Sequence, residues 1–108
     1  MVSDALPPPI AALLDAANAN DTDAFLAAFT EAGMVDDWGR EFTGAEAIRG
    51  WSDAEFIGVR VSLAVTERSA RDDETVVTAT VGGDGFNGPS HSAFRVAGER
   101  VERMTIRA

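Results

Sequence analysis

The chain lacks cysteine and tyrosine, and its 108 residues include a single histidine, His91. Without cysteine it can form no disulfide and offers no thiolate for nucleophilic or redox chemistry. One histidine is too few for a zinc site built from histidine and cysteine ligands, so we expect neither such a metal nor a bound cofactor. Metal binding by carboxylates alone stays open.

Basic side chains are also scarce. Nine arginines, with no lysine, stand against eighteen aspartates and glutamates, which gives a formal net charge of −9. Such a chain repels phosphate backbones and anionic membrane surfaces, so nucleic acid and membranes are not expected partners. No apolar run approaches the roughly eighteen residues of a membrane span, and the N-terminus lacks the features of a signal peptide. We expect a soluble cytoplasmic protein.

The length and the 45% hydrophobic content fit one domain, residues 1–108, with a single core. Its first half has helical periodicity. After the prolines at 7–9, one apolar stripe with helical spacing is formed by Ile10, Leu13, Leu14 and Ala17. This stripe predicts a first helix.

A second short helix is expected to start near Asp21 or Thr22. Its apolar face is made of Phe25, Leu26 and Phe29. Gly33 is a suitable stop, because glycine readily adopts the conformation that ends helices. Two short strands, 34–37 and 40–43, then flank Trp38 and Gly39.

The segment 43–46 matches a capping box and predicts the start of a third helix. The apolar face of this helix would be Ala47, Ile48 and Trp51. A similar pattern at 52–55 predicts that the helix breaks and restarts there.

From residue 59 the apolar period changes to two, which indicates strands. Strands are predicted at 59–66, 75–81, 91–96 and 101–107, with a glycine-rich loop at 82–89. Because short connections join them, the sheet should be antiparallel. Helices in the first half and strands in the second indicate the α+β class.

This order of elements resembles the nuclear transport factor 2-like superfamily, and the resemblance covers essentially the whole chain. The residues that carry it are Asn18–Asp21 with Phe25 and Phe29, Asp37–Arg40 with Gly44, Ile48 and Trp51, and the loop Gly85–Pro89. The pattern is similar to that of small bacterial SnoaL-like members.

The resemblance implies a cystatin-like barrel, in which a cone-shaped, curved, mostly antiparallel sheet wraps around three N-terminal helices. It also implies a pocket at the open end of the cone and, often, a homodimer. It implies little about chemistry, because this fold serves isomerases, dehydratases, cyclases, binding modules and dimerisation domains.

Asp36 and Asp37 alternate along a strand, so one should face inward and the other outward. Burial in an apolar pocket raises the pKa of a carboxyl group and suits it to abstract a proton next to a carbonyl. We therefore take Asp37 as the catalytic candidate. The alternative is a solvated carboxylate, or a structural pair with Arg40.

Four further residues are ligand-binding candidates. Trp38 and Trp51 offer flat apolar rings for stacking, although Trp51 also completes the apolar face of its helix. Arg40 could bind a ligand carboxylate in bidentate fashion or pair with a neighbouring carboxylate. Phe86 lies in the glycine-rich loop, where it could form part of a lid or anchor the loop on the sheet.

The sequence lacks the usual catalytic groups of two chemistries found in this superfamily. The isomerase-type site resembles a base paired with a tyrosine hydroxyl, and with no tyrosine a protonated Asp36 or Glu55 would have to replace that donor. The dehydratase-type site uses histidine with aspartate, yet His91 shares strand parity with Ala93 and should point away from the core.

Three functions follow from these observations. The first is a pocket protein that binds a small hydrophobic molecule. The second is an enzyme of the isomerase, cyclase or dehydratase type with Asp37 as general acid or base. The third is a homodimerisation module that uses the outer sheet face, with Arg60, Ser62, Thr78 and Arg95.

Overall fold

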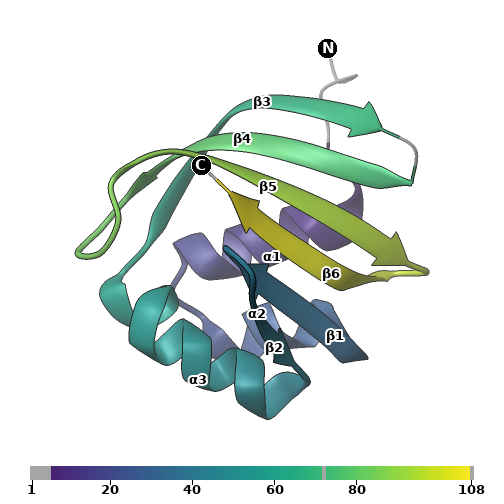
Figure 1. The fold of residues 1–108 in the computed structure, drawn as a ribbon, viewed down its shortest axis with the longest axis horizontal. Coiled ribbons are helices and arrows are strands. Elements are labelled where there is room, and N and C mark those ends of the chain that lie inside the picture. Colours follow the sequence, from purple (N-terminus) through teal and green to yellow (C-terminus); the bar gives the residue numbers. More distant parts are fainter. Residues whose placement is uncertain (1–5, 72, 108) are drawn as a thin grey trace.

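The computed structural model describes residues 6–71 and 73–107 (Figure 1). Its helices are α1 (Pro8–Asn18), α2 (Thr22–Ala27) and α3 (Ala45–Glu55), and the 3₁₀ turn η2 (Ile57–Val59) follows α3. Its strands are β1 (Phe29–Asp37), β2 (Arg40–Thr43), β3 (Ser62–Arg71), β4 (Glu74–Gly82), β5 (Gly88–Ala97) and β6 (Arg100–Arg107). The predicted element order and the α+β class are confirmed. Over the described residues, no helix is long and apolar enough to cross a membrane.

All six strands form one sheet in the order β2-β1-β6-β5-β4-β3. Neighbouring strands are antiparallel except β1 and β6, which run parallel. The short connections between the last four strands indicate antiparallel pairing among those strands. These connections give no information on how β1 pairs with β6, because the chain between these two strands passes through α3 and most of the sheet. The mostly antiparallel, curved sheet is confirmed, but over the described residues it stays open, with β2 and β3 at its edges (Figure 1).

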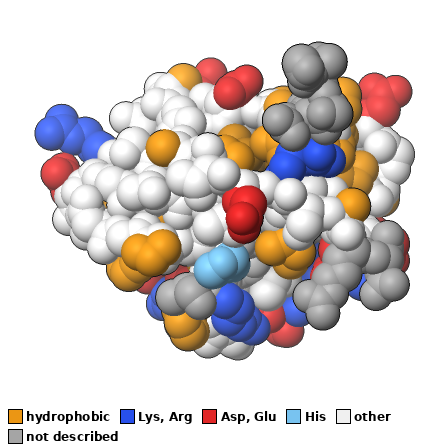
Figure 2. Space-filling view, turned by 90° about the horizontal axis from the view of Figure 1, so that it is seen from above, with side chains coloured by type: hydrophobic (Ala, Val, Ile, Leu, Met, Phe, Trp, Pro, Cys, Tyr) orange, Lys and Arg blue, Asp and Glu red, His pale blue; other side chains and the backbone are white. Residues whose placement is uncertain are grey.

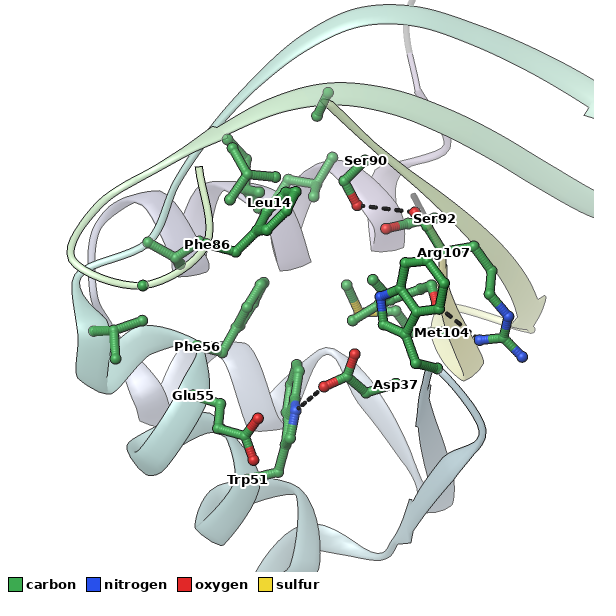
Figure 3. Close-up of a pocket in the computed structure, with 18 of the residues that line it drawn as sticks. Leu14, Asp37, Trp51, Glu55, Phe56, Phe86, Ser90, Ser92, Met104 and Arg107 are labelled. Atoms are coloured by element: carbon green, nitrogen blue, oxygen red, sulfur yellow. Dashed lines mark hydrogen bonds between the residues drawn. The ribbon is translucent and has the colours of Figure 1, made fainter. Parts of the chain in front are cut away.

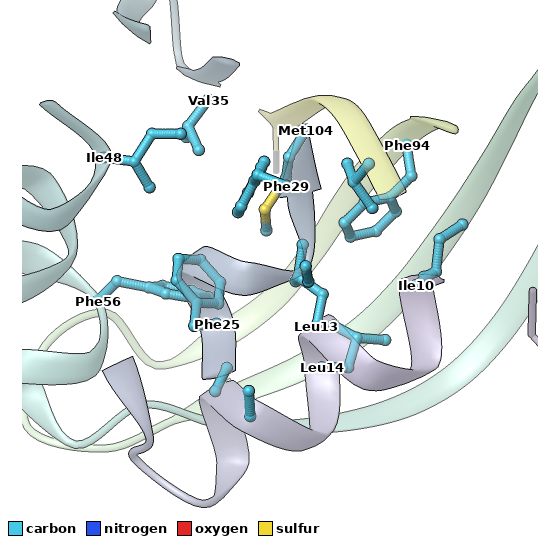
Figure 4. Packing of buried hydrophobic residues seen from close by; sticks show 14 of the residues in the cluster. Ile10, Leu13, Leu14, Phe25, Phe29, Val35, Ile48, Phe56, Phe94 and Met104 are labelled. Carbon is cyan, nitrogen blue, oxygen red and sulfur yellow. The ribbon is translucent and has the colours of Figure 1, made fainter. Parts of the chain in front are cut away.

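The core lies between α1 and the inner face of the sheet (Figure 4). Ile10 and Leu13 are fully buried, which confirms the predicted stripe of α1. They belong to one apolar cluster with Phe94 of β5 and Met104 of β6. The sheet thus bends around a helix that fills its concave side.

The predicted end of the second helix was wrong. α2 ends at Ala27, and Phe29 begins β1 instead of continuing the helix. Gly33 lies inside β1, where the pairing with β6 shifts register between Phe29 and Met34. A Cβ at Gly33 would lie 3.0 Å from the Phe29 Cβ and 3.0 Å from the Thr30 carbonyl oxygen. The glycine therefore permits an irregularity in the strand rather than a helix stop.

The predicted capping box and helix break were also wrong. The N-cap of α3 is Gly44 at φ +89°, a conformation that glycine adopts without strain, and no side chain caps the helix. The helix runs unbroken through Ser52, whose buried hydroxyl accepts a hydrogen bond from the Ile57 N–H at 3.4 Å. Ser52 therefore supports the chain that leaves the helix and does not start a new one.

Two smaller expectations changed for local reasons. Ile48 and Trp51 form the buried face of α3, but Ala47 is exposed, because only one side of this helix meets the sheet. Val59 lies in η2 and not in a strand, and β3 begins at Ser62. The left-handed conformation of Arg60 (φ 56°) turns the chain between the two elements.

Candidate functional site

A cavity of about 480 Å³ lies between α3, the turn from β1 to β2, the loop from β4 to β5 and the inner face of the sheet (Figure 3). Its wall is mostly apolar. Buried or half-buried apolar side chains of the wall include Leu14, Phe56, Val61, Leu63, Val77 and Met104. The cavity falls in the range of small-molecule sites, which are concave and mainly apolar with a few polar groups.

Strand register assembles the polar part of this wall. Asp37 on β1 pairs with Ile106 on β6, and Ile106 pairs with Ser92 on β5. All three line the cavity. Adjacent strands lie about 4.8 Å apart, so the carboxylate and the hydroxyl face the cavity from backbones about 10 Å apart, with an apolar side chain between them.

Two hydrogen-bond donors bind the same carboxylate oxygen of Asp37. Its Oδ2 accepts from the Trp51 indole at 3.0 Å and from the Arg40 guanidinium at 2.6 Å. The same guanidinium binds Glu55 at both carboxylate oxygens, at 2.9 and 2.7 Å. Hydrogen bonding to Arg40 lowers the pKa of Glu55, and the bonds to Glu55 and then Asp37 raise the pKa of Arg40. The predicted pair of Arg40 with Asp37 is present.

Asp36 points to the opposite face of β1, as the alternation predicted. Its side chain is buried and pairs with Arg103 at 3.0 Å and with Arg107 at 3.2 Å. It also accepts the Gly39 N–H at 2.7 Å. The hydrogen bond from Arg107 and then the one from Gly39 hold the pKa of Asp36 below its ordinary value. Asp36 thus links β6 to the turn that carries the site.

That turn places Trp38 at the cavity in an unusual backbone conformation. Trp38 (φ 56°) and Gly39 (φ 91°) both have positive φ, as a two-residue hairpin turn of type I′ requires. A bulky residue rarely adopts this conformation, which favours asparagine or glycine. The indole is nevertheless 61% exposed and lines the cavity. An exposed aromatic in a strained position favours a role in contacting a ligand.

Trp51 and Phe86 enter the wall differently. Trp51 is buried, and its ring stacks on Phe56 at 4.9 Å and lies 6.1 Å from Phe42. Trp51 therefore contributes its N–H to Asp37 more than a free ring face. Phe86 is 58% exposed in the loop between β4 and β5 and also lines the cavity. The catalytic candidate and all four ligand-binding candidates thus line the same cavity.

Some residues of the wall were missed or misjudged from the sequence. Ser90 and Ser92 share the parity of buried Phe94, so the alternation of β5 could have identified them. The Ser90 hydroxyl donates to the Arg107 carbonyl at 3.3 Å (Figure 3). No sequence pattern indicated that Arg107, at the end of β6, lines the cavity, because only the parallel pairing brings this residue close to β1.

Neither carboxylate that could have replaced a tyrosine hydroxyl is suited to that role. Asp36 and Glu55 are both paired with arginine, and both have lowered pKa values. They are therefore ionised at neutral pH and cannot donate a hydrogen bond. His91 is exposed on β5 and does not line the cavity, as its parity predicted.

Comparison with known families agrees with this architecture. A sequence model of the SnoaL-like domain matches residues 10–104. The chain belongs to the SnoaL-like domain family. This match confirms the resemblance to the SnoaL-like members of the nuclear transport factor 2-like superfamily. Solved structures called NTF2-like or ketosteroid isomerase-like share the fold of the chain. A search of curated proteins found no match.

Three solved structures illustrate how similar other members are to this SnoaL-like domain. A candidate polyketide cyclase from Sinorhizobium meliloti is 28% identical, with a TM-score of 0.85 over 94% of this chain and 95% of that one. A Catenulispora acidiphila protein in complex with trimethylamine is 23% identical, with a TM-score of 0.80 over 96% and 87%. A Mycobacterium tuberculosis protein in complex with estradiol-17β-hemisuccinate is 16% identical, with a TM-score of 0.76 over 93% and 90%.

Side chains that could hold a metal ion do not form a group among the described residues. Across residues 6–71 and 73–107, no three histidine, aspartate or glutamate side chains converge on a common point. The two carboxylates at the cavity, Asp37 and Glu55, both pair with Arg40.

The pairing of Asp36 predicts a loss of stability in acid. A carboxyl group whose pKa is lower in the folded state contributes stability above its unfolded value of about 3.9, and this contribution disappears as the pH falls through the folded value. We expect Asp36→Asn to lower the free energy of unfolding by about 2 kcal/mol at pH 7. Urea unfolding followed by circular dichroism from pH 7 to pH 2 checks this. The difference in the free energy of unfolding between the unmodified protein and Asp36→Asn should become smaller below about pH 4. A difference that does not change with pH would contradict the prediction.

Proposed function

We propose that this SnoaL-like domain binds a small hydrophobic molecule in the cavity between α3 and the sheet. The observation that carries the proposal is a cavity of about 480 Å³ whose wall is mostly apolar and includes a few polar side chains. Two of the large apolar side chains that are exposed, Trp38 and Phe86, line this same cavity. Exposed apolar groups gathered at a concave site favour ligand binding.

The similar structures support a ligand of modest size. By their descriptions, one neighbour holds a steroid derivative, another is a designed binder of 17-OHP, and a third holds trimethylamine. At 16%, 18% and 23% identity, what they share with this chain is the fold. We therefore propose the class of ligand, a compact apolar molecule, and no individual compound.

A substitution that fills the cavity tests the proposal. Ala79 of β4 is buried on the wall, so Ala79→Phe should occupy part of the space and weaken binding of adamantylmethanol by about tenfold or more. Trp38 and Trp51 are the only tryptophans and both line the cavity, so tryptophan fluorescence reports on it directly. Isothermal titration calorimetry provides a second readout.

The matched control is Ala64→Phe. Ala64 is exposed on the neighbouring strand β3 and does not line the cavity, so the same substitution there should leave binding unchanged. If Ala79→Phe and Ala64→Phe weaken binding equally, or if neither changes it, the cavity is not the ligand site.

A second candidate is acid–base catalysis by Asp37 in an isomerase, cyclase or dehydratase. Both hydrogen bonds to this carboxylate reach Oδ2, and its other oxygen points into the cavity (Figure 3). A general base needs such an acceptor within reach of a substrate proton. Adamantyl methyl ketone incubated in deuterated water offers a test by NMR. Exchange that disappears in Asp37→Asn would support catalysis, and absence of exchange would favour binding alone.

The third candidate, a homodimer through the outer sheet face, concerns a different surface. Thr78 of β4 and His91 of β5 are register partners on that face, and an acidic and a basic side chain lie on either side of the histidine (Figure 2). Arg60, expected on this face, instead precedes β3 and pairs with Asp84 at 3.3 Å. One face of a sheet can pack against the same face of a second copy. Light scattering would then give about twice the 11.4 kDa of one chain.

A further inference from the structure

We propose that the ligand carries a protonated amine on its apolar body and that Asp37 is the counter-ion for this amine. The inference rests on the proposed function, because it names the chemistry of the ligand in the same cavity. The inference depends on which charged side chains of the wall already have partners and on which of their atoms can still form a hydrogen bond with a ligand.

The cationic side chains of the wall are already paired. Arg40 binds Glu55 through two hydrogen bonds and Asp37 through a third. Arg107 pairs with the buried carboxylate of Asp36 and donates to the Ile106 carbonyl at 2.7 Å. A carboxylate or phosphate on a ligand would have to displace one of these partners. Among the described residues of the wall, the cavity therefore offers an anion no unpaired cation.

An acceptor, in contrast, is available. Both donors of Asp37 bind Oδ2, and in Figure 3 the second oxygen points into the cavity toward the space below Ser92. The Asp37 side chain is only 14% exposed. A charge-assisted hydrogen bond formed there is sheltered from water and is therefore stronger than one at the surface.

The charges around Asp37 also favour a cation, because the second arginine of the wall, Arg107, pairs with Asp36 outside the wall. One arginine, Arg40, lies between the two carboxylates of Asp37 and Glu55, which leaves one negative charge uncompensated in this group. The rings of Phe56, Trp38 and Phe86 line the same cavity and can attract a cation through their faces. The net charge of −9 further favours the approach of cations over anions.

Three probes with one apolar frame test the inference. Adamantylmethylamine is a cation at pH 7, adamantylmethanol is neutral and adamantanecarboxylate is an anion. Calorimetry on the full chain should rank them in that order, with the amine at least about tenfold tighter than the alcohol. The advantage of the amine should shrink as the salt concentration rises, because salt screens the charge pair.

The matched variants are Asp37→Asn and Asp53→Asn. Each removes one carboxylate, but Asp53 is exposed on α3 and lies outside the wall. We expect Asp37→Asn to bring the amine to the affinity of the alcohol and Asp53→Asn to keep the preference. Circular dichroism of both variants verifies that they fold.

Each outcome separates the inference from the proposed function. If the alcohol binds as tightly as the amine in the unmodified protein, the amine inference is wrong while the cavity remains a binding site. Tighter binding of the carboxylate would also overturn it. If none of the three probes binds, the proposed function itself fails. The ranking in the unmodified protein decides the inference even if Asp37→Asn does not fold.

Discussion

Phe25→Ala is expected to lower the free energy of unfolding by about 3–5 kcal/mol, the usual cost of removing a fully buried phenylalanine. Phe25 has no exposed surface, and its ring lies 5.4 Å from the ring of Phe29 and 5.5 Å from that of Phe56. It therefore joins α2 to β1 and to the end of α3. Chemical denaturation followed by circular dichroism measures the loss, which is a large fraction of the stability of a small domain.

The same substitution at Phe86 is the control. Phe86 is mostly exposed, so Phe86→Ala should change the free energy of unfolding by no more than about 0.5 kcal/mol. If Phe86 contacts the ligand, the variant should still weaken binding of adamantylmethanol. A loss of stability at Phe86 as large as at Phe25 would mean that the loop between β4 and β5 is part of the core.

Gly58→Ala is the second substitution with a large expected effect. A Cβ at this position would overlap the backbone carbonyl of Asp53 and lie 3.0 Å from the Asp53 Cα. Backbone cannot rotate away as a flexible side chain can, so η2 must move off the end of α3. Overpacking of this kind costs about 3 kcal/mol. The shift would also disturb Phe56 and Val59, which line the cavity, so ligand binding should weaken as well.

Gly50→Ala is the matched control for this prediction. Gly50 lies within α3, and a Cβ there would meet no atom within 4 Å. Alanine favours helix more than glycine does, so Gly50→Ala should raise the free energy of unfolding by about 1 kcal/mol. The two variants should thus change stability in opposite directions, and equal effects would show that the space around Gly58 does not control the result.

Sequence patterns predicted the elements where one periodicity dominated. The stripe of Ile10 and Leu13 identified α1, and the alternation around Phe94 identified β5 and the outward direction of His91. Prediction failed where backbone geometry outweighed local preference. Phe29 fits a helix face as well as a strand, and only the pairing of β1 with β6 decides for the strand.

The contacts of the candidate site likewise divide into those that the sequence could predict and those that it could not. Asp37 and Arg40 are close in sequence and lie on one hairpin, so their pairing was open to prediction. The bond from Trp51 to Asp37 spans 14 residues and the pair of Arg107 with Asp36 spans 71, and no local pattern announces contacts of that kind. Those long-range partners determine which oxygen of Asp37 remains for a ligand.

By itself, then, the sequence determined the α+β order, the alternation that separates Asp36 from Asp37, and the position of the aromatic side chains near a turn. Local periodicity and turn chemistry suffice for these features, because each depends on residues a few positions apart. Only the tertiary structure decided that Arg107 pairs with Asp36 and that one carboxylate oxygen of Asp37 faces an apolar cavity (Figure 3). Those facts depend on the parallel pairing of β1 with β6 and on the packing of α3, which join residues far apart in the chain.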